Sequence, residues 1–209
     1  MAIVSWSKKF IFIKTHKTAG TSMEVDLAAH CDDDDIVTPI FPPNQNHVPR
    51  NYQVAIGTFY NHMPATEIEG FIGERHFANA FKFCFERHPV DKCLSHFGML
   101  INSPHHNNPD APSKWEEYLD YGEFPKDDNL YCDQEGKVIV DRIYRYDQLR
   151  ESWKDICTRL NIPVRPIQAK EKTGFRAGVP TFGQVMANLK QKERIMEAFS
   201  ASVQLLRWN

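Results

Sequence analysis

The feature that most constrains the fold is segment 10–22, FIFIKTHKTAGTS, near the start of the 209-residue chain. Its apolar beginning, Phe10–Ile13, predicts a buried strand, and residues 23–29 after the polar turn predict a helix. A tight turn between a strand and a helix N-terminus presents backbone N–H groups to a phosphate. Lys17 adds a cation, and Gly20 lets a ligand approach the backbone closely. Hydroxyl donors complete the predicted anion-binding loop: Thr18, Thr21 and Ser22.

The order of residues in this loop indicates which phosphate it suits. A nucleoside-triphosphate loop places its lysine after the last glycine. Here Lys17 precedes Gly20, and no glycine lies five residues before that lysine. The loop therefore favours a single phosphate or a phosphosulfate. The structural alternative is a strand–helix turn whose polar side chains only cap the helix.

A second strand-like run, Phe81–Glu86, leads directly into the sequence RHPVDKCLS at 87–95. Pro89 suits the first turn of a helix. Arg87 then lies at the end of the strand, and Ser95 lies roughly 10 Å along the helix. The planar guanidinium can donate two parallel hydrogen bonds to a phosphate. The alternative is an arginine that pairs with a neighbouring acid, beside a solvated serine.

Taken together, the two segments resemble the sulfotransferase superfamily, whose donor is 3′-phosphoadenosine 5′-phosphosulfate (PAPS). Residues 16–22 are similar to its 5′-phosphosulfate loop, often written P-K-[TS]-[GA]-[GT]-T-S. Residues 87–95 are similar to its 3′-phosphate motif, R-[ND]-P-x-D-R-x-x-S. The match is closest to the carbohydrate-type branch, which includes the 2-O-sulfotransferases. Three more stretches follow that branch in order, so that the resemblance runs from about residue 9 to 162: 61–68, 141–149 and 152–162.

The chain also departs from the family pattern. His16 stands where the family usually has proline, and His88 replaces the usual Asn or Asp after the arginine. Lys92 replaces an arginine and keeps its charge. The part after about residue 170 lacks the tyrosine-rich ending of many relatives.

The resemblance implies transfer of a sulfuryl group from PAPS to a hydroxyl-bearing acceptor, with a saccharide as the favoured class. Lys17 would stabilise the leaving phosphate, and His62 would take the acceptor proton, because histidine titrates near neutrality. His16, Glu24 and Glu67 remain alternative bases, and His62 could instead be a core or capping histidine. No metal is required. The residues expected to bind the donor are His16, Lys17, Thr18, Ala19, Gly20, Thr21, Ser22, Arg87, Ser95, and Lys170, Lys172 and Arg176 in a late basic loop.

Two other functions stay open. A P-loop small-molecule kinase would need a lysine after the loop glycine and an acid for Mg²⁺. A nucleotide-binding module without catalysis would bind the donor but transfer no sulfuryl group to any acceptor.

The rest of the chain predicts an α/β fold of the P-loop-like, three-layer kind, with a mainly parallel sheet and helices on both faces. We expect a single sulfotransferase domain over 1–209. Ligands bind beyond the carboxyl ends of parallel strands, and Lys17, His62 and Arg87 each follow a predicted strand. Further elements are expected: strands at 54–60 and 138–144, a helix at 151–160, and a helix at 113–121 with Ser113 as N-cap and Glu116 in a capping box.

The composition limits the classes of partner that we expect for this chain. The net charge of −2 gives no general surface for nucleic acid, and no apolar run is long enough to span a membrane. The five cysteines are scattered without a C-x-x-C pair, which predicts reduced thiols and a cytoplasmic protein. The acidic run 32–35 is expected to be solvated. Acceptor specificity is expected in loops 32–53 and 102–135.

Overall fold

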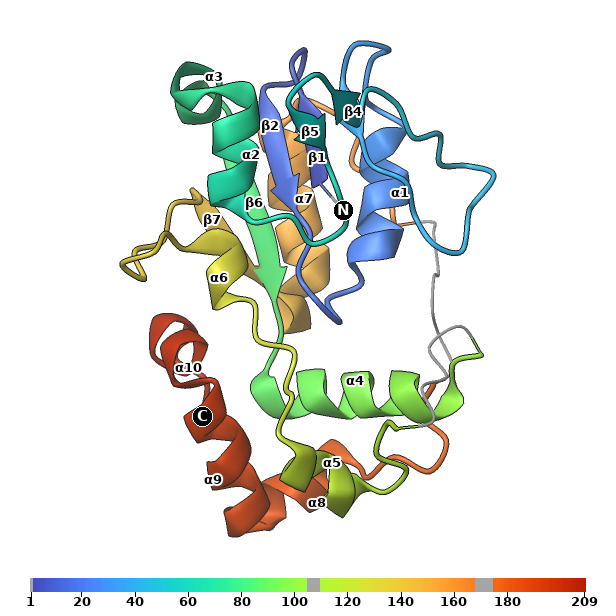
Figure 1. Cartoon of the computed structure of the whole chain (residues 1–209), viewed down its shortest axis with the longest axis vertical. Helices are drawn as coiled ribbons and strands as arrows, with labels where there is room; N and C mark the ends of the chain where they lie inside the picture. The colour runs from blue at the N-terminus through green and yellow to red at the C-terminus, as the bar shows by residue number, and fades with distance from the viewer. Residues whose placement is uncertain (1, 105–109, 168–174) are drawn as a thin grey trace. The chain divides into compact units, whose positions relative to one another are not determined.

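The computed structural model describes residues 2–104, 110–167 and 175–209, shown in Figure 1. The chain forms two compact units. The first unit contains residues 1–86 and 127–171, and the second contains residues 87–126 and 172–209. The expected single domain over the whole chain stays a prediction.

A five-stranded mixed sheet forms the centre of the first unit, in the order β3–β1–β2–β6–β7. The two pairs β2–β6 and β6–β7 are parallel, whereas β1 is antiparallel to both β2 and β3. The prediction of a mainly parallel sheet was therefore only partly right. Four residues join β1 to β2, which is too short for the crossover that parallel strands need. The strands are β1 (Ala2–Ser5), β2 (Phe10–Ile13), β3 (Ile36–Val37), β6 (Phe81–Glu86) and β7 (Arg142–Arg145).

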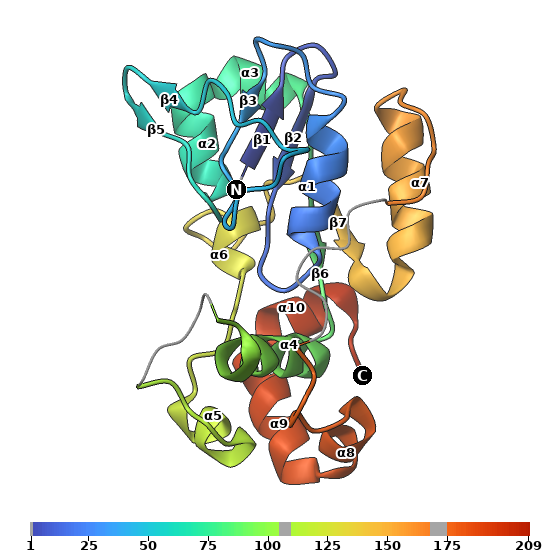
Figure 2. The same cartoon turned by 90° about the vertical axis from the view of Figure 1, so that its right-hand side faces the viewer.

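Helices cover both faces of this sheet, as the sequence predicts (Figure 2). Alternate residues of a strand point to opposite faces, so Phe10 and Phe12 pack on one side and Ile11 and Ile13 on the other. The first face is covered by α1 (Gly20–Ala28) and by α7 (Leu149–Arg159), which follows the 3₁₀ turn Tyr146–Gln148. The second face is covered by α2 (Ala65–Ile72), α3 (Glu74–Asn79) and α6 (Asp128–Tyr131).

Several short elements differ from the predictions. The expected strand at 54–60 is a small separate hairpin of β4 (Gln53–Val54) and β5 (Gly57–Thr58). The strand expected at 138–144 begins only at Arg142. The acidic run is not wholly solvated, because the buried Asp35 carboxylate accepts hydrogen bonds from the Ser5 hydroxyl and the Trp6 N–H. That buried acid fixes the turn which precedes β3.

The second unit is helical among its described residues. It contains α4 (Pro89–Asn102), α5 (Trp115–Tyr121), α8 (Phe182–Ala187), α9 (Leu189–Ala198) and α10 (Ser200–Leu206). Its core gathers Phe97 of α4, Trp115 and Tyr118 of α5, and Phe199 after α9. Pro89 opens α4, as predicted.

The helix expected at 113–121 begins two residues later, at Trp115. The residue that closes its first turn is Glu117 rather than Glu116. The Glu117 Oε2 accepts from the backbone N–H groups of Ser113 and Lys114, each at 3.2 Å. The prediction was off by one residue because the N-cap is Lys114 rather than Ser113, which makes Glu117 the third residue of the helix.

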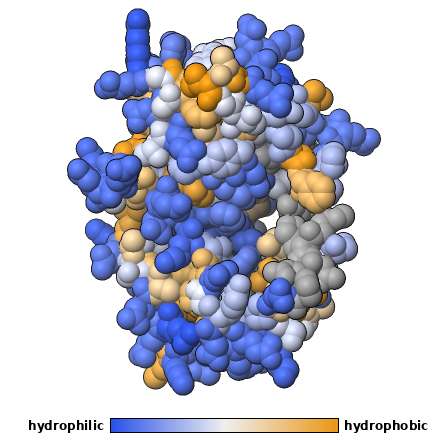
Figure 3. All heavy atoms as spheres, viewed as in Figure 1, coloured by the Kyte–Doolittle hydropathy of each residue, from blue (hydrophilic) through white to orange (hydrophobic). Residues whose placement is uncertain are grey.

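Within the described part of the chain, no helix is both long and apolar enough to cross a bilayer. On the face drawn in Figure 3, hydrophilic residues predominate and apolar ones form small patches. All five cysteines are free thiols.

Candidate functional site

The loop between β2 and α1 has the local geometry of an anion site. Helix α1 begins at Gly20, three residues earlier than predicted. Lys17 and Ala19 adopt left-handed backbone conformations, with φ of 60° and 57°. Ala19 occupies the N-cap and has no polar side-chain atom, so no side chain caps the helix there. An uncapped N-terminus of a nine-residue helix presents its first N–H groups and the positive end of its dipole at the loop.

Gly20 is required by close packing rather than by its backbone angles. A Cβ at this position would lie 2.6 Å from Cγ of Lys14, well inside contact distance. The absent side chain therefore makes room for the aliphatic stem of a buried lysine, which passes beneath the loop.

That lysine is the main feature that the sequence reasoning missed. Lys14 is buried, and its Nζ donates to the Thr21 hydroxyl at 2.8 Å and lies 3.5 Å from the Glu24 carboxylate. The other Glu24 oxygen lies 3.2 Å from Nε2 of His47, and both of those side chains are fully buried. Because a buried charge needs a partner, this network fixes Lys14 behind the loop. The available signal was a lysine placed directly after four apolar strand residues.

The hydroxyl side chains of the loop are used internally. Thr18 is buried, and its Oγ1 lies 2.9 Å from that of Thr15. The Thr15 hydroxyl in turn donates to the carbonyl of Phe85, near the end of β6. Thr18 therefore helps to tie the loop to the neighbouring strand, and its role as a donor to phosphate stays a prediction. Thr15 was not predicted.

Two histidines lie against each other beside the loop. The rings of His16 and His62 are stacked, with centroids 3.7 Å apart and planes 10° apart. The buried Asp127 carboxylate accepts from the His16 backbone N–H at 2.8 Å and from the ring Nδ1–H. The sequence reasoning brought His16 and His62 to one site but missed Asp127, which is distant in the chain and belongs to no motif.

His62 differs from the predicted near-neutral base. Its Nδ1–H donates to the Lys14 carbonyl at 2.9 Å, which leaves the lone pair on Nε2. Burial, the neighbouring His16 and the Lys14 ammonium lower the pKa of His62 to about 2. The ring is therefore neutral at physiological pH, and in this state it is a weak base.

In the second unit, two arginines share one carboxylate. The Arg87 Nε donates to Asp91 Oδ2 at 2.6 Å, and Arg176 Nη2 donates to Oδ1 at 2.6 Å. Burial raises the pKa of Asp91, but the two guanidinium groups outweigh it and hold that pKa below its usual value. Ser95 lies one turn further along α4. Arg87 thus has the acidic partner of the structural alternative, and it shares that carboxylate with Arg176.

Two other predicted donor residues, Lys170 and Lys172, lie outside the described residues. The convergence of Arg87 and Ser95 on one phosphate, and the binding of the other end of the same nucleotide by Lys17, stay predictions.

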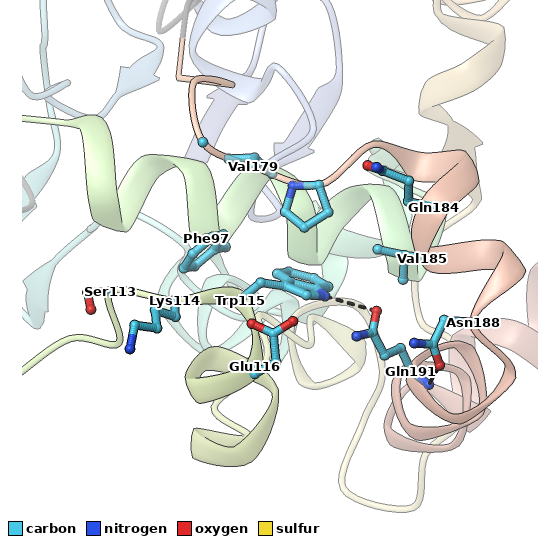
Figure 4. Close-up of a pocket in the computed structure, with 12 residues that line it drawn as sticks. Phe97, Ser113, Lys114, Trp115, Glu116, Val179, Gln184, Val185, Asn188 and Gln191 are labelled. Carbon is cyan, nitrogen blue, oxygen red and sulfur yellow. Dashed lines mark hydrogen bonds between the residues drawn. The ribbon is translucent and has the colours of Figure 1, made fainter.

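A cavity of about 610 Å³ lies within the second unit (Figure 4). Its lining combines the apolar side chains of Phe97, Trp115 and Val185 with amide side chains and with the charged side chains of Lys114 and Glu116. The Gln191 Oε1 accepts from the Trp115 indole N–H at 3.2 Å. Residues 113–116 of its wall belong to the predicted acceptor loop 102–135. The other predicted acceptor loop, 32–53, is tied down by the Arg50 guanidinium, which donates to the carbonyls of Ala28, Cys31 and Asp32.

No protein-family model matches this chain, and no curated protein matches it significantly.

Proposed function

We propose that this chain is a PAPS-dependent sulfotransferase and that the loop at 16–22 binds the 5′-phosphosulfate. The observation that carries the proposal is the construction of that loop. The uncapped helix N-terminus and Lys17 belong to one short turn at the end of β2, and the buried Lys14 supports that turn from below. Backbone N–H groups and a cation gathered on one turn stabilise a small, highly charged anion. The proposal includes a P-loop-like arrangement of β2, the loop and α1.

The proposed reaction is an in-line displacement at sulfur. An acceptor oxygen forms a bond to sulfur while the bond from sulfur to the bridging oxygen breaks. The electron pair of the broken bond goes to the 5′-phosphate of the product, 3′-phosphoadenosine 5′-phosphate (PAP). Lys17 and the helix N–H groups stabilise the charge that grows there, which is where a catalyst gains rate. An imidazole of the His16–His62 pair takes the acceptor proton.

The order of lysine and glycine in the loop argues against the kinase alternative, and a thermal-melt assay tests this. PAP should clearly raise the midpoint temperature of unfolding, because a ligand at about 100 times its Kd adds about 2.7 kcal/mol to the unfolding free energy. ATP with Mg²⁺ should give little or no shift in the same thermal-melt assay. A larger shift with ATP and Mg²⁺ would favour the kinase, and PAP binding without turnover on any acceptor would favour the non-catalytic module.

The arginine pair on Asp91 supports binding of the 3′-phosphate by the second unit. Arg87→Ala should weaken PAP binding about 10- to 100-fold, since a hydrogen bond to a charged group contributes about 1.5–3 kcal/mol. Binding of AMP, which lacks the 3′-phosphate, should change little. Isothermal titration of both nucleotides measures the ratio.

Arg159→Ala is the matched control for that variant, because the Arg159 Nε also donates to an aspartate four residues away, at 2.8 Å from Asp155. Its PAP affinity should stay at the wild-type value. Equal losses of PAP and AMP affinity in Arg87→Ala would show that Arg87 does not recognise the 3′-phosphate.

For the acceptor we propose a hydroxyl-bearing molecule, and a saccharide is the first class to test. The cavity of the second unit supports this choice. A wall that combines apolar side chains with hydroxyl, amide and charged groups suits a ligand with both C–H and O–H surfaces. Screening mono- and oligosaccharides with labelled PAPS identifies the acceptor.

A further inference from the structure

His16 and Asp127 form a pair that the motif resemblance does not account for, because the family usually has proline at the position of His16. The Asp127 side chain is 0% exposed, and its two oxygens hold His16 at both the backbone N–H and the ring Nδ1. A buried carboxylate that accepts two hydrogen bonds from one residue fixes both the backbone and the ring of that residue. His16 therefore has a defined orientation beside Lys17, the next residue in the chain.

The same contact determines the tautomer. A carboxylate accepts, so Nδ1 of His16 carries a proton, and the neutral ring keeps its lone pair on Nε2. The His16 side chain remains 40% exposed, whereas Asp127 is closed off from solvent. His16 thus combines a fixed ring, a lone pair on Nε2 and a partly exposed side chain.

The charges around the two rings are unequal. Among the residues that the structure describes, His62 hydrogen-bonds to a backbone carbonyl and to no carboxylate, and the Lys14 ammonium opposes a positive charge on it. A positive charge on His16 would instead be compensated by the full negative charge of Asp127. The charged or titratable groups next to His16 include Asp127, the stacked His62 and, along the chain, Lys17.

We propose that His16 is the catalytic base of the sulfuryl transfer and that Asp127 is its positioning residue. This inference rests on the proposed function. In the reaction, the acceptor O–H proton moves to Nε2 of His16 as the oxygen bonds to sulfur, and the imidazolium later returns that proton to water. Two adjacent residues of one loop thus carry the two tasks: Lys17 stabilises the leaving group, and His16 accepts the proton.

Two asparagine substitutions distinguish the role of His16 from that of His62. The amide nitrogen of asparagine can replace Nδ1, so His16→Asn can keep the hydrogen bond to Asp127, and His62→Asn can keep the one to the Lys14 carbonyl. Each variant loses the Nε2 nitrogen. His16→Asn should lower kcat about 10²- to 10⁴-fold, the usual contribution of a general base. PAP affinity should stay within about twofold, and His62→Asn should lower kcat less than about tenfold.

The assay uses ³⁵S-labelled PAPS with water and with a panel of saccharides as acceptors, and calorimetry gives the Kd of PAP. An active wild type with a His16→Asn variant that keeps most of its kcat would overturn this inference alone. A 100-fold loss of kcat in His62→Asn, with no such loss in His16→Asn, would also overturn it. A wild type that neither binds PAP nor releases labelled sulfate would overturn the proposed function as well.

Asp127→Asn supplies a readout that a purely structural role would not move. The amide oxygen can still accept from Nδ1, but the negative charge is gone. The rate constant kcat should fall about tenfold, because the imidazolium that forms in the reaction loses its counter-charge, while the KM for PAPS should stay within about twofold. A kcat that stays near the wild-type value would make Asp127 a structural clamp only.

Discussion

Lys17→Ala is expected to abolish sulfuryl transfer, with kcat lowered by at least about 10²- to 10³-fold. Removing one fixed group that stabilises transition-state charge costs about this much. The ammonium would act on the bridging oxygen and the leaving phosphate, where charge grows only as the S–O bond breaks. The loss should therefore appear mainly in kcat, and PAP affinity should fall much less. Steady-state kinetics with labelled PAPS and calorimetry with PAP measure the two effects separately.

The fold should survive this substitution. Lys17 has a φ of 60°, which costs energy for any residue with a Cβ, and alanine keeps the Cβ. The matched control is Lys8→Ala, which removes an exposed lysine of the same unit. Both variants should melt close to the wild type, and Lys8→Ala should keep full activity. Near-normal turnover of Lys17→Ala would remove the loop from the mechanism.

Lys14→Met is expected to give the largest loss of stability, about 3–5 kcal/mol in the free energy of unfolding. The substitution keeps the aliphatic stem beside Gly20 but removes the ammonium next to Glu24. The Glu24 carboxylate, which is 0% exposed, would keep only the contact with His47. Removing one partner of a buried ion pair leaves a charge in low dielectric, which costs about this amount. Denaturant unfolding followed by circular dichroism measures the loss.

Two further variants test the cause of that loss. Lys82→Met removes another buried lysine of the same unit, but the partner of Lys82, Asp141, is 46% exposed and stays solvated. It should cost only about 1–2 kcal/mol, from hydrogen bonds to the Phe77 and Ala80 carbonyls. Glu24→Gln added to Lys14→Met should recover part of the stability, since it removes the stranded charge. If Lys14→Met is no worse than Lys82→Met, the buried pair contributes little.

Part of this structure follows from short stretches of sequence. The run at Phe10–Ile13 and the polar turn after it specify strand, loop and helix locally, and Pro89 specifies the start of α4. The helices on both faces of the sheet follow from alternation within the strands. The antiparallel pairing of β1 and the hairpin β4–β5 were not predicted. Strand partners depend on loop length and on long-range packing rather than on the pattern of one segment.

The residues of the candidate site also fall into those that the sequence predicts and those that only the folded chain reveals. Lys17, Gly20, Arg87 and Ser95 can be found in the sequence because each belongs to a pattern of residues close together in the chain. Asp127 and the Glu24–His47 contact can be found only in the folded chain.

By itself, the sequence determined an α/β protein with a short lysine- and glycine-containing loop between a buried strand and a helix. Only the tertiary structure decided that Lys14 lies buried beneath that loop, that Asp127 holds His16, and that His62 is neutral. The physical reason is that burial and charge pairing depend on which distant segments meet. A side chain takes its protonation state and its orientation from those neighbours.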